Sequence, residues 1–448
     1  MKNKFTGNFI GKLLHKFKEF QAIKNFFFLA LLQGSNFLIF LILYPYLSIK
    51  LGVSNFGLVI LAQSLMSFFL ILADYGFNLQ STQKIAVCKD DKTAIALVHS
   101  KTIYTKILLL VIGFALLYLI VIIVPTFREI QTLLLWSYLF VVGQTLIPIW
   151  FFQGIEKFQY ISYINVAGKI ISLLVIFLLV NEPTHYIWVN PILGIGNLMV
   201  ALWGLSFINR KFDISWSVFN WNEIKTVLKE GWGIFFSSFS TNFYVNSNIL
   251  ILKIIVDDLL LVGYYGIADR IVGFMKQLVV IAAQSIYPTA CKMADDKAKF
   301  KQFMRTILKV FIGITFSFCA FIFVLAEYII FIFTKQYLPE AVALLRILCF
   351  TPLFIAINNP AYQALIIYNH QKAYTFVLVS ASLICMILNS ILCCFYGNFG
   401  TAWSVFITEI YVMVGLNAVL FWKYPTISFL INQEHSKKYE KQIINRIE

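Results

Sequence analysis

Apolar segments long enough to cross a bilayer follow one another along almost the whole chain, and this pattern leaves few folds open. A membrane-spanning helix needs about 20 mostly apolar residues, because in lipid the backbone must satisfy its own hydrogen bonds. Only 13% of the 448 residues are charged, against about 25% in soluble domains. The sequence therefore predicts an all-α integral membrane protein. Twelve transmembrane helices are expected, at residues 25–48, 56–77, 103–125, 132–153, 162–180, 186–208, 231–255, 262–288, 306–333, 342–368, 374–396 and 400–422.

The basic residues between these spans predict the orientation of the chain, because cytoplasmic loops carry an excess of Lys and Arg. Four of the 36 basic residues lie on the side opposite the N-terminus and four lie inside spans, which leaves 28 on the side of the N-terminus. Lys106 is counted among these 28. Both termini are predicted to be cytoplasmic. The net charge of +15 is typical of such loops, so no nucleic-acid partner is expected.

A long polar connection near the middle of the chain separates six spans from six. It predicts two six-helix lobes of the same orientation, which permits a parallel repeat. Gly57–Gln63 in the second span aligns weakly with Gly263–Asp269 in the eighth. The expected parts are a cytoplasmic basic arm (1–24), an N-terminal lobe (25–208), a cytoplasmic linker (209–230), a C-terminal lobe (231–422) and a cytoplasmic tail (423–448).

The eighth span carries three charges, Asp269, Arg270 and Lys276, which fall on one side of the helix. At about 100° per residue, Asp269, Arg270, Lys276 and Gln277 lie within about 120° of arc. Charges in the bilayer are costly and usually face a cavity or a partner. We interpret the stripe as the wall of a central cationic cavity, with an ion pair to Asp269 as the structural alternative. One acid does not neutralise two cations, so an anionic ligand is expected to complete the site.

Other spans also contain polar candidates. Gln63 and Asp74 share a face of the second span, Lys169 lies in the fifth, Asn242 in the seventh and Glu409 in the twelfth. Each has a structural alternative: Asp74 and Lys169 could reach the cytoplasmic interface, Asn242 could hold helices together, and Glu409 could be a protonated core residue. We assign Gln63 and Asn242 to substrate binding, and Asp74, Asp269 and Glu409 to ion coupling or charge tuning.

Signals of enzyme chemistry are missing from the sequence. No nucleophile motif or glycine-rich phosphate loop appears, and the histidines and cysteines lack metal-ligand spacing, so no metal or cofactor is expected. Pro360 follows two asparagines and predicts an interruption of the tenth span. Lys169, Arg270 and Lys276 suit a phosphate-bearing ligand, because Arg binds it bidentately and Lys as a point charge.

Five segments share a pattern with one known family: residues 51–57, 73–78, 148–157, 229–232 and 263–270. They resemble bacterial polysaccharide flippases of the Wzx type, members of the multidrug/oligosaccharidyl-lipid/polysaccharide exporter superfamily. The chain departs from the family pattern at Thr289, where a basic residue is expected after Tyr-Pro, so no substrate contact is assigned there. The resemblance covers nearly the whole chain.

The resemblance implies two six-helix lobes with alternating access, similar to those of MATE transporters, in a bacterial inner membrane. It implies as substrate an undecaprenyl-diphosphate-linked oligosaccharide repeat unit, of O-antigen or a related polysaccharide, moved from the cytoplasmic to the periplasmic leaflet. Lys169, Arg270 and Lys276, with Gln63, Asn242 and Gln277, would bind it. Proton or sodium coupling is left open, as is partnership with the polysaccharide polymerase and the chain-length machinery.

Two other functions were weighed. A multidrug antiporter of the MATE type would favour a net-acidic cavity for organic cations, which the cationic stripe does not supply. A membrane glycan polymerase or ligase would need a large periplasmic loop, and the predicted outer loops are all short. A flippase is therefore the preferred interpretation.

Overall fold

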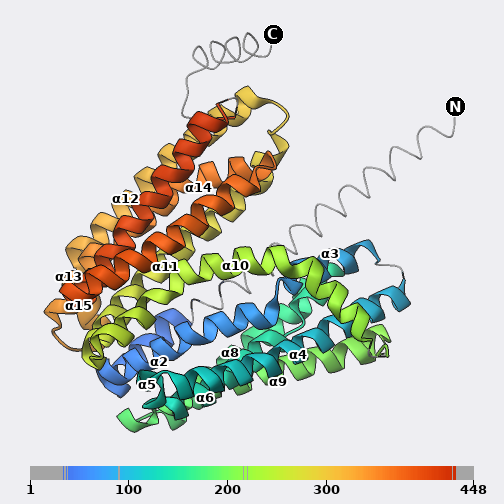
Figure 1. Ribbon diagram of the computed structural model, residues 1–448, viewed down its shortest axis with the longest axis horizontal. Coiled ribbons are helices and arrows are strands. Elements are labelled where there is room, and N and C mark those ends of the chain that lie inside the picture. The colour runs from blue at the N-terminus through green and yellow to red at the C-terminus, as the bar shows by residue number, and fades with distance from the viewer. Residues whose placement is uncertain are drawn as a thin grey trace. The chain divides into compact units, whose positions relative to one another are not determined.

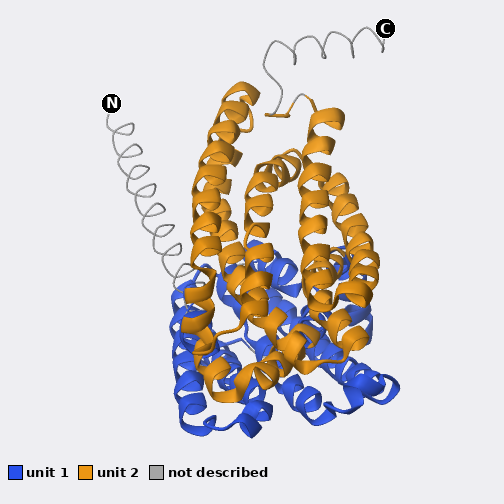
Figure 2. Cartoon of the chain, turned by 90° about the vertical axis from the view of Figure 1, so that its left-hand side faces the viewer, with its two compact units in different colours: residues 1–44, 66–236 blue, residues 45–65, 237–448 orange. Residues whose placement is uncertain are grey.

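The computed structural model describes residues 34, 37, 39–88, 91–214, 216–218, 220–425 and 427–429, and within them every regular element is a helix (Figure 1). The predicted all-α class is thereby confirmed. The basic arm 1–24 lies outside the described residues, as do most of the first span and most of the tail. The chain forms two compact units, residues 1–44 with 66–236 (unit 1) and residues 45–65 with 237–448 (unit 2; Figure 2).

Unit 1 is built from the end of α2, the start of α10 and the helices between them. Its core is formed around the short helix α7, where the side chains of Trp150, Phe151 and Phe152 are almost completely buried. They pack with Ile85 and Ile208, among others. The elements are η1 (Ile39–Leu43), α2 (Tyr44–Asp74), α3 (Phe77–Val87), α4 (Lys92–Ile123), α5 (Pro125–Arg128), α6 (Gln131–Leu146), α7 (Ile149–Gly154), α8 (Phe158–Leu179), η2 (Pro183–His185), α9 (Tyr186–Phe212) and α10 (Trp221–Val256).

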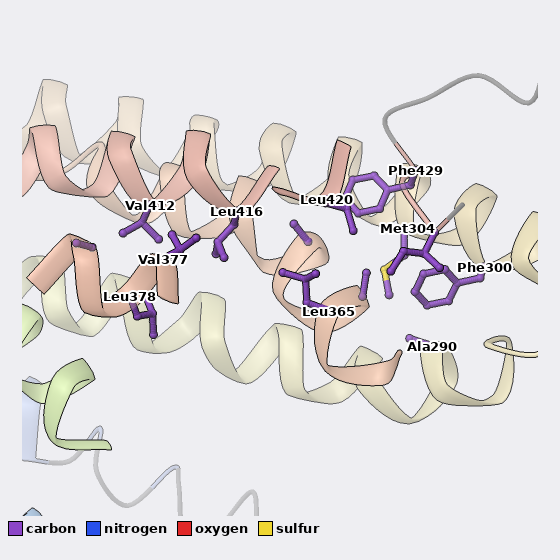
Figure 3. Packing of buried hydrophobic residues seen from close by; sticks show 14 of the residues in the cluster. Ala290, Phe300, Met304, Leu365, Val377, Leu378, Val412, Leu416, Leu420 and Phe429 are labelled. Atoms are coloured by element: carbon purple, nitrogen blue, oxygen red, sulfur yellow. The ribbon is translucent and has the colours of Figure 1, made fainter. Parts of the chain in front are cut away.

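Unit 2 takes residues 45–65 of α2, the second part of α10 and all later helices. Its largest apolar cluster joins α12, α14 and the long helix α15, and includes Met304, Leu365, Leu378 and Leu416 (Figure 3). Within the bilayer, close van der Waals packing of these side chains, rather than their removal from water, favours association of the helices. The later elements are α11 (Leu259–Lys292), α12 (Lys297–Thr334), α13 (Pro339–Leu348), α14 (Thr351–Ile367) and α15 (Gln371–Lys423).

The expected spans correspond closely to these helices. Among the described residues, nine helical segments are long and apolar enough to cross a membrane. The segment Gln371–Lys423 contains two of the expected spans, and its helix departs from helical geometry at Gly397, where φ is 58°. The charged helix α11 is not among the nine, although it has 34 residues. The protein is thus a multi-pass membrane protein, and the count of twelve stays a prediction.

Two local expectations change with the structure. α14 continues through Pro360, and the tenth span is divided instead between α13 and α14, at Cys349 and Phe350. The predicted interruption at Pro360 is therefore wrong in its position. The connection between α9 and α10 is residues 213–220, so the second part of the segment 209–230 is helical.

Candidate functional site

A polar cavity of about 590 Å³ lies inside unit 2. Helices α10, α11, α14 and α15 surround it, and its lining includes Lys276, Glu409, Asn358, Asn359, Gln284 and four tyrosines. The volume falls in the range of about 300–1,000 Å³ that is typical of small-molecule sites. This cavity is the candidate functional site of unit 2.

One ion pair lies in the cavity wall. The Lys276 Nζ atom on α11 donates to the Glu409 Oε1 atom on α15 at 2.9 Å. The side chain of Glu409 is 3% exposed and that of Lys276 is 24% exposed. The buried Tyr244 on α10 lies near the Glu409 carboxylate. Lys276 therefore has a counter-ion that the sequence argument had treated as a separate acid.

Arg270 lies about two helical turns from Lys276 toward the N-terminus of α11, and it contacts a different helix. Its Nη2 atom donates to the Gln63 Oε1 atom on α2 at 3.3 Å. The two helices approach closely at Gly57 and Gly263, where a Cβ atom on Gly57 would lie 2.7 Å from the Gly263 Cα atom. Glycine is needed at this crossing because any larger residue would force the backbones apart. The two glycines that align in the sequence thus contact each other.

The polar stripe of α11 is divided between these two surroundings. Lys276, Gln284 and Tyr287 line the cavity, whereas Asp269 and Arg270 lie beyond its lining. A single continuous wet face was expected from the helical angles. Tertiary packing against α2 separates the N-terminal part of the stripe from the cavity. Gln277 and Asp269 are both half-buried.

Asn242 lies on α10 among polar side chains that connect helices. Its Oδ1 atom accepts from the Asn246 Nδ2 atom at 2.6 Å. One turn further, the Asn389 side chain of α15 donates to both the backbone and the side-chain oxygen of Asn248. Buried amides of this kind hold membrane helices together. The structural alternative raised for this span therefore has direct contacts in its favour.

Unit 1 contains a second buried ion pair, which the sequence argument missed. The Lys106 Nζ atom of α4 donates to the Asp74 Oδ1 atom at 2.9 Å and to the Thr145 carbonyl oxygen at 3.1 Å. It also lies 4.1 Å from the ring centroid of Trp150. Lys106 is 1% exposed, so its assignment to the cytoplasmic surface was wrong. A lysine near the middle of an apolar helix of 32 residues, with an aspartate in the preceding span, was the signal available.

Lys169 is half-buried on α8 and belongs to unit 1, whereas Arg270 and Lys276 belong to unit 2. The joint site of these three cations therefore stays a prediction. The contacts of the described residues instead place the candidate charges in separate groups: Lys106 with Asp74 in unit 1, and Lys276 with Glu409 in unit 2. Arg270 contacts Gln63 in unit 2.

Solved structures with the same fold are membrane transporters. An inward-facing multidrug resistance MATE family transporter of the MOP superfamily matches with a TM-score of 0.68 at 14% identity, over 88% of this chain and 94% of that one. The lipid II flippase MurJ, in an inward-closed conformation, matches with a TM-score of 0.64 at 18% identity, over 92% and 89%. These likenesses show a MATE-like fold, as the sequence predicted.

Relatives in sequence distinguish between the kinds of transporter that share this fold. A protein of Escherichia coli (strain K12) is 26% identical over 389 residues, 86% of this chain and 93% of the relative. A protein of Shigella dysenteriae is 23% identical over 392 residues, 87% and 98%. Both carry the name "Putative O-antigen transporter". The family described as "Polysaccharide biosynthesis protein" matches residues 22–294, more than half of the chain. The chain therefore belongs to the polysaccharide biosynthesis protein family.

Proposed function

We propose that this protein is a flippase for a lipid-linked oligosaccharide. It moves an undecaprenyl-diphosphate-linked repeat unit, of O-antigen or a related surface polysaccharide, from the cytoplasmic to the periplasmic leaflet. In this proposal the membrane is the bacterial inner membrane, both termini are cytoplasmic, and access to the substrate alternates between its two sides. The polymerase and chain-length machinery would receive the flipped unit.

One observation carries this proposal: family membership joined to relatives of matching length that are named for O-antigen transport. The alignments cover 93% and 98% of those relatives, so no extra catalytic domain distinguishes them from this chain. The MATE-like fold alone would suit a multidrug transporter equally well. The family match separates the two readings, because the matched family is one of polysaccharide biosynthesis.

Arg270 is our candidate for the diphosphate. A guanidinium group presents paired N–H donors that match the oxygens of a phosphate, and it stays charged at every physiological pH. The Arg270 Nη2 atom donates to the neutral side-chain amide of Gln63 at 3.3 Å, a contact that does not neutralise the guanidinium charge. We assign Lys169 of unit 1 to the same ligand.

Lys276 and Glu409 are our candidates for coupling. A proton on Glu409 would remove the charge that holds Lys276, and Lys276 could then bind an anion. Conversely, an anion bound to Lys276 would favour protonation of Glu409, because such linkage is reciprocal. Asp269, half-buried on the same helix, would tune the charge of the region.

The proposal is tested in cells that lack their own repeat-unit flippase and depend on this gene. Arg270→Gln should abolish most surface polysaccharide, while Arg270→Lys should retain part of it, because the charge persists without the bidentate geometry. Gly273→Ala is the matched control on the same helix, since a Cβ atom there would meet nothing within 4 Å. Membrane levels of each variant are measured by immunoblot.

Two outcomes would contradict the proposal. Normal polysaccharide in cells with Arg270→Gln would remove Arg270 from the substrate site. Resistance to cationic drugs on overexpression, with no glycan defect on deletion, would favour a multidrug antiporter instead.

A further inference from the structure

The cavity of unit 2 contains more hydrogen-bonding groups than the protein itself uses. Asn358 on α14 is 8% exposed and lines the cavity. Within the described part of the chain, its side chain makes no hydrogen bond. A buried amide without a partner costs about 1–3 kcal/mol. Its amide group therefore requires water or a polar ligand inside the cavity.

The groups around Asn358 have the same character. The Asn359 Oδ1 atom accepts from the Gln363 Nε2 atom at 3.1 Å, and Gln363 also donates to the Ala283 carbonyl oxygen at 2.7 Å. This arrangement fixes both amides. It leaves the NH2 group of Asn359 and the side-chain carbonyl of Gln363 without a hydrogen bond to the described residues. The wall thus offers both donors and acceptors in fixed positions.

Aromatic side chains form another part of the same wall. The rings of Tyr362 on α14 and Tyr374 on α15 have centroids 4.6 Å apart and are inclined at 52°. Tyr244 and Tyr287 also line the cavity. A tyrosine combines a flat apolar face with a polar hydroxyl. Such faces suit the C–H side of a sugar ring, while the hydroxyls and amides suit its O–H groups.

While Lys276 and Glu409 are paired, the charge balance of the cavity disfavours charged ligands. Lys276 and Glu409 are the two ionised side chains among its lining residues, and they neutralise each other. A lipophilic cation would need a surplus of negative charge, and a diphosphate would need a surplus of positive charge. A neutral ligand rich in hydroxyl groups needs neither. With a volume of about 590 Å³, the cavity is large enough for such a small molecule.

We propose that the cavity of unit 2 is a binding subsite for sugar residues of the transported lipid, separate from the diphosphate contact at Arg270. Asn358 and the Tyr362–Tyr374 pair are its specificity-determining residues. This inference rests on the proposed flippase function and names the part of the substrate that the cavity holds. The polyprenyl chain stays in the lipid phase.

The test measures binding to the purified full-length protein in nanodiscs. The probes are undecaprenyl diphosphate without sugar, and the same lipid carrying a single glucose, galactose or N-acetylglucosamine. The variants are Asn358→Leu and Tyr374→Leu. Tyr328→Leu on α12 is the matched control, because Tyr328 is exposed and lies outside the cavity lining.

The wild type should bind at least one sugar-bearing lipid about tenfold more tightly than undecaprenyl diphosphate, which corresponds to about 1.4 kcal/mol. Each cavity variant should lose this preference and keep its affinity for undecaprenyl diphosphate. Retained binding of the sugar-free lipid also shows that the variant is folded. Tyr328→Leu should behave like the wild type.

Three results would overturn the inference, and they are distinguishable. Equal binding of all four lipids by the wild type would remove the sugar subsite and leave the flippase proposal standing. If Asn358→Leu lost affinity equally for all four lipids, the cavity would not discriminate between sugar-bearing and sugar-free lipid. No binding of any of the four by the wild type would count against the flippase proposal itself.

Discussion

The buried pair of Lys106 and Asp74 gives a prediction that separates a structural role from an ion-coupling role. At 2.9 Å, and with an effective dielectric constant of about 20, the attraction between unit charges is about 6 kcal/mol. Desolvation offsets part of this value. Removal of one member of such a pair leaves an uncompensated charge, which typically costs about 3–5 kcal/mol.

We expect Lys106→Met to destabilise the protein by about 3–5 kcal/mol, because Lys106 is 1% exposed and Asp74 loses its counter-ion. Asp74→Asn should cost nearly as much, since Lys106 then stays charged among apolar groups. The double variant should recover most of the loss, because a buried pair replaced by neutral groups is often nearly neutral for stability. The double-mutant cycle isolates the pair from the Trp150 and Thr145 contacts.

The assay is thermal unfolding of the detergent-purified full-length chain at a fixed heating rate. At about 2–4 °C per kcal/mol for a unit of this size, each single variant should unfold roughly 6–20 °C below the wild type. Surface polysaccharide is measured in parallel. A double variant that is stable and active assigns the pair to structure, whereas a stable but inactive one assigns Asp74 to coupling. A single variant with no change in unfolding temperature would refute the reasoning.

Three further outcomes follow from the described contacts. Gly263→Ala should lower the free energy of unfolding by about 1–3 kcal/mol, because its Cβ atom would lie too close to the Val53 carbonyl oxygen. A loss no larger than that of Gly273→Ala, measured by thermal unfolding, would contradict this close approach. Hydrogen bonds from backbone N–H groups, above all that of Lys299, lower the pKa of Asp296 at the start of α12 below 3.8. The stabilisation that this carboxylate provides is therefore present above pH 3.8 and is lost as the pH falls through the pKa of the folded state. Asp296→Asn should therefore reduce the acid-induced loss of stability as the pH falls from about 5 to below 3.8, and an unchanged loss would count against this assignment. Lys84→Met should change the unfolding free energy by less than about 1 kcal/mol, since Lys84 and its partner Glu230 on α10 are 45% and 47% exposed. A fall in unfolding temperature of more than about 4 °C would show that this contact is stronger.

Much of the candidate site could be located from the sequence. Charges at Arg270 and Lys276 inside an apolar span are conspicuous, because lipid tolerates them only against a partner or a cavity. The sequence also indicated Glu409 and Asn358 as polar residues within spans. It did not indicate that Glu409 neutralises Lys276, because the two residues lie 133 positions apart and their meeting depends on the packing of α15 against α11.

Lys106 also shows that the sequence alone does not identify contacts between distant segments. Its neighbours in the chain are basic and polar, so residue counting placed it with the cytoplasmic loops. Helix α4 begins eleven residues before the expected span, so Lys106 lies well inside a helix. Its side chain is buried there against Asp74 and Trp150. Helix ends are set by caps such as that of Asp91, which accepts from the backbone of Thr93 and Ala94.

The sequence by itself determined the class of this protein, because hydrocarbon imposes one solution on long apolar segments, namely helices whose backbone bonds are internal. It also determined which span carries charges along one face. Only the tertiary structure decided how that polarity is divided. Close contact at Gly57 and Gly263 brings Arg270 to Gln63, while Lys276 is left in a neutral cavity with Glu409. Contacts between distant segments depend on shape complementarity over many side chains, which no local pattern specifies.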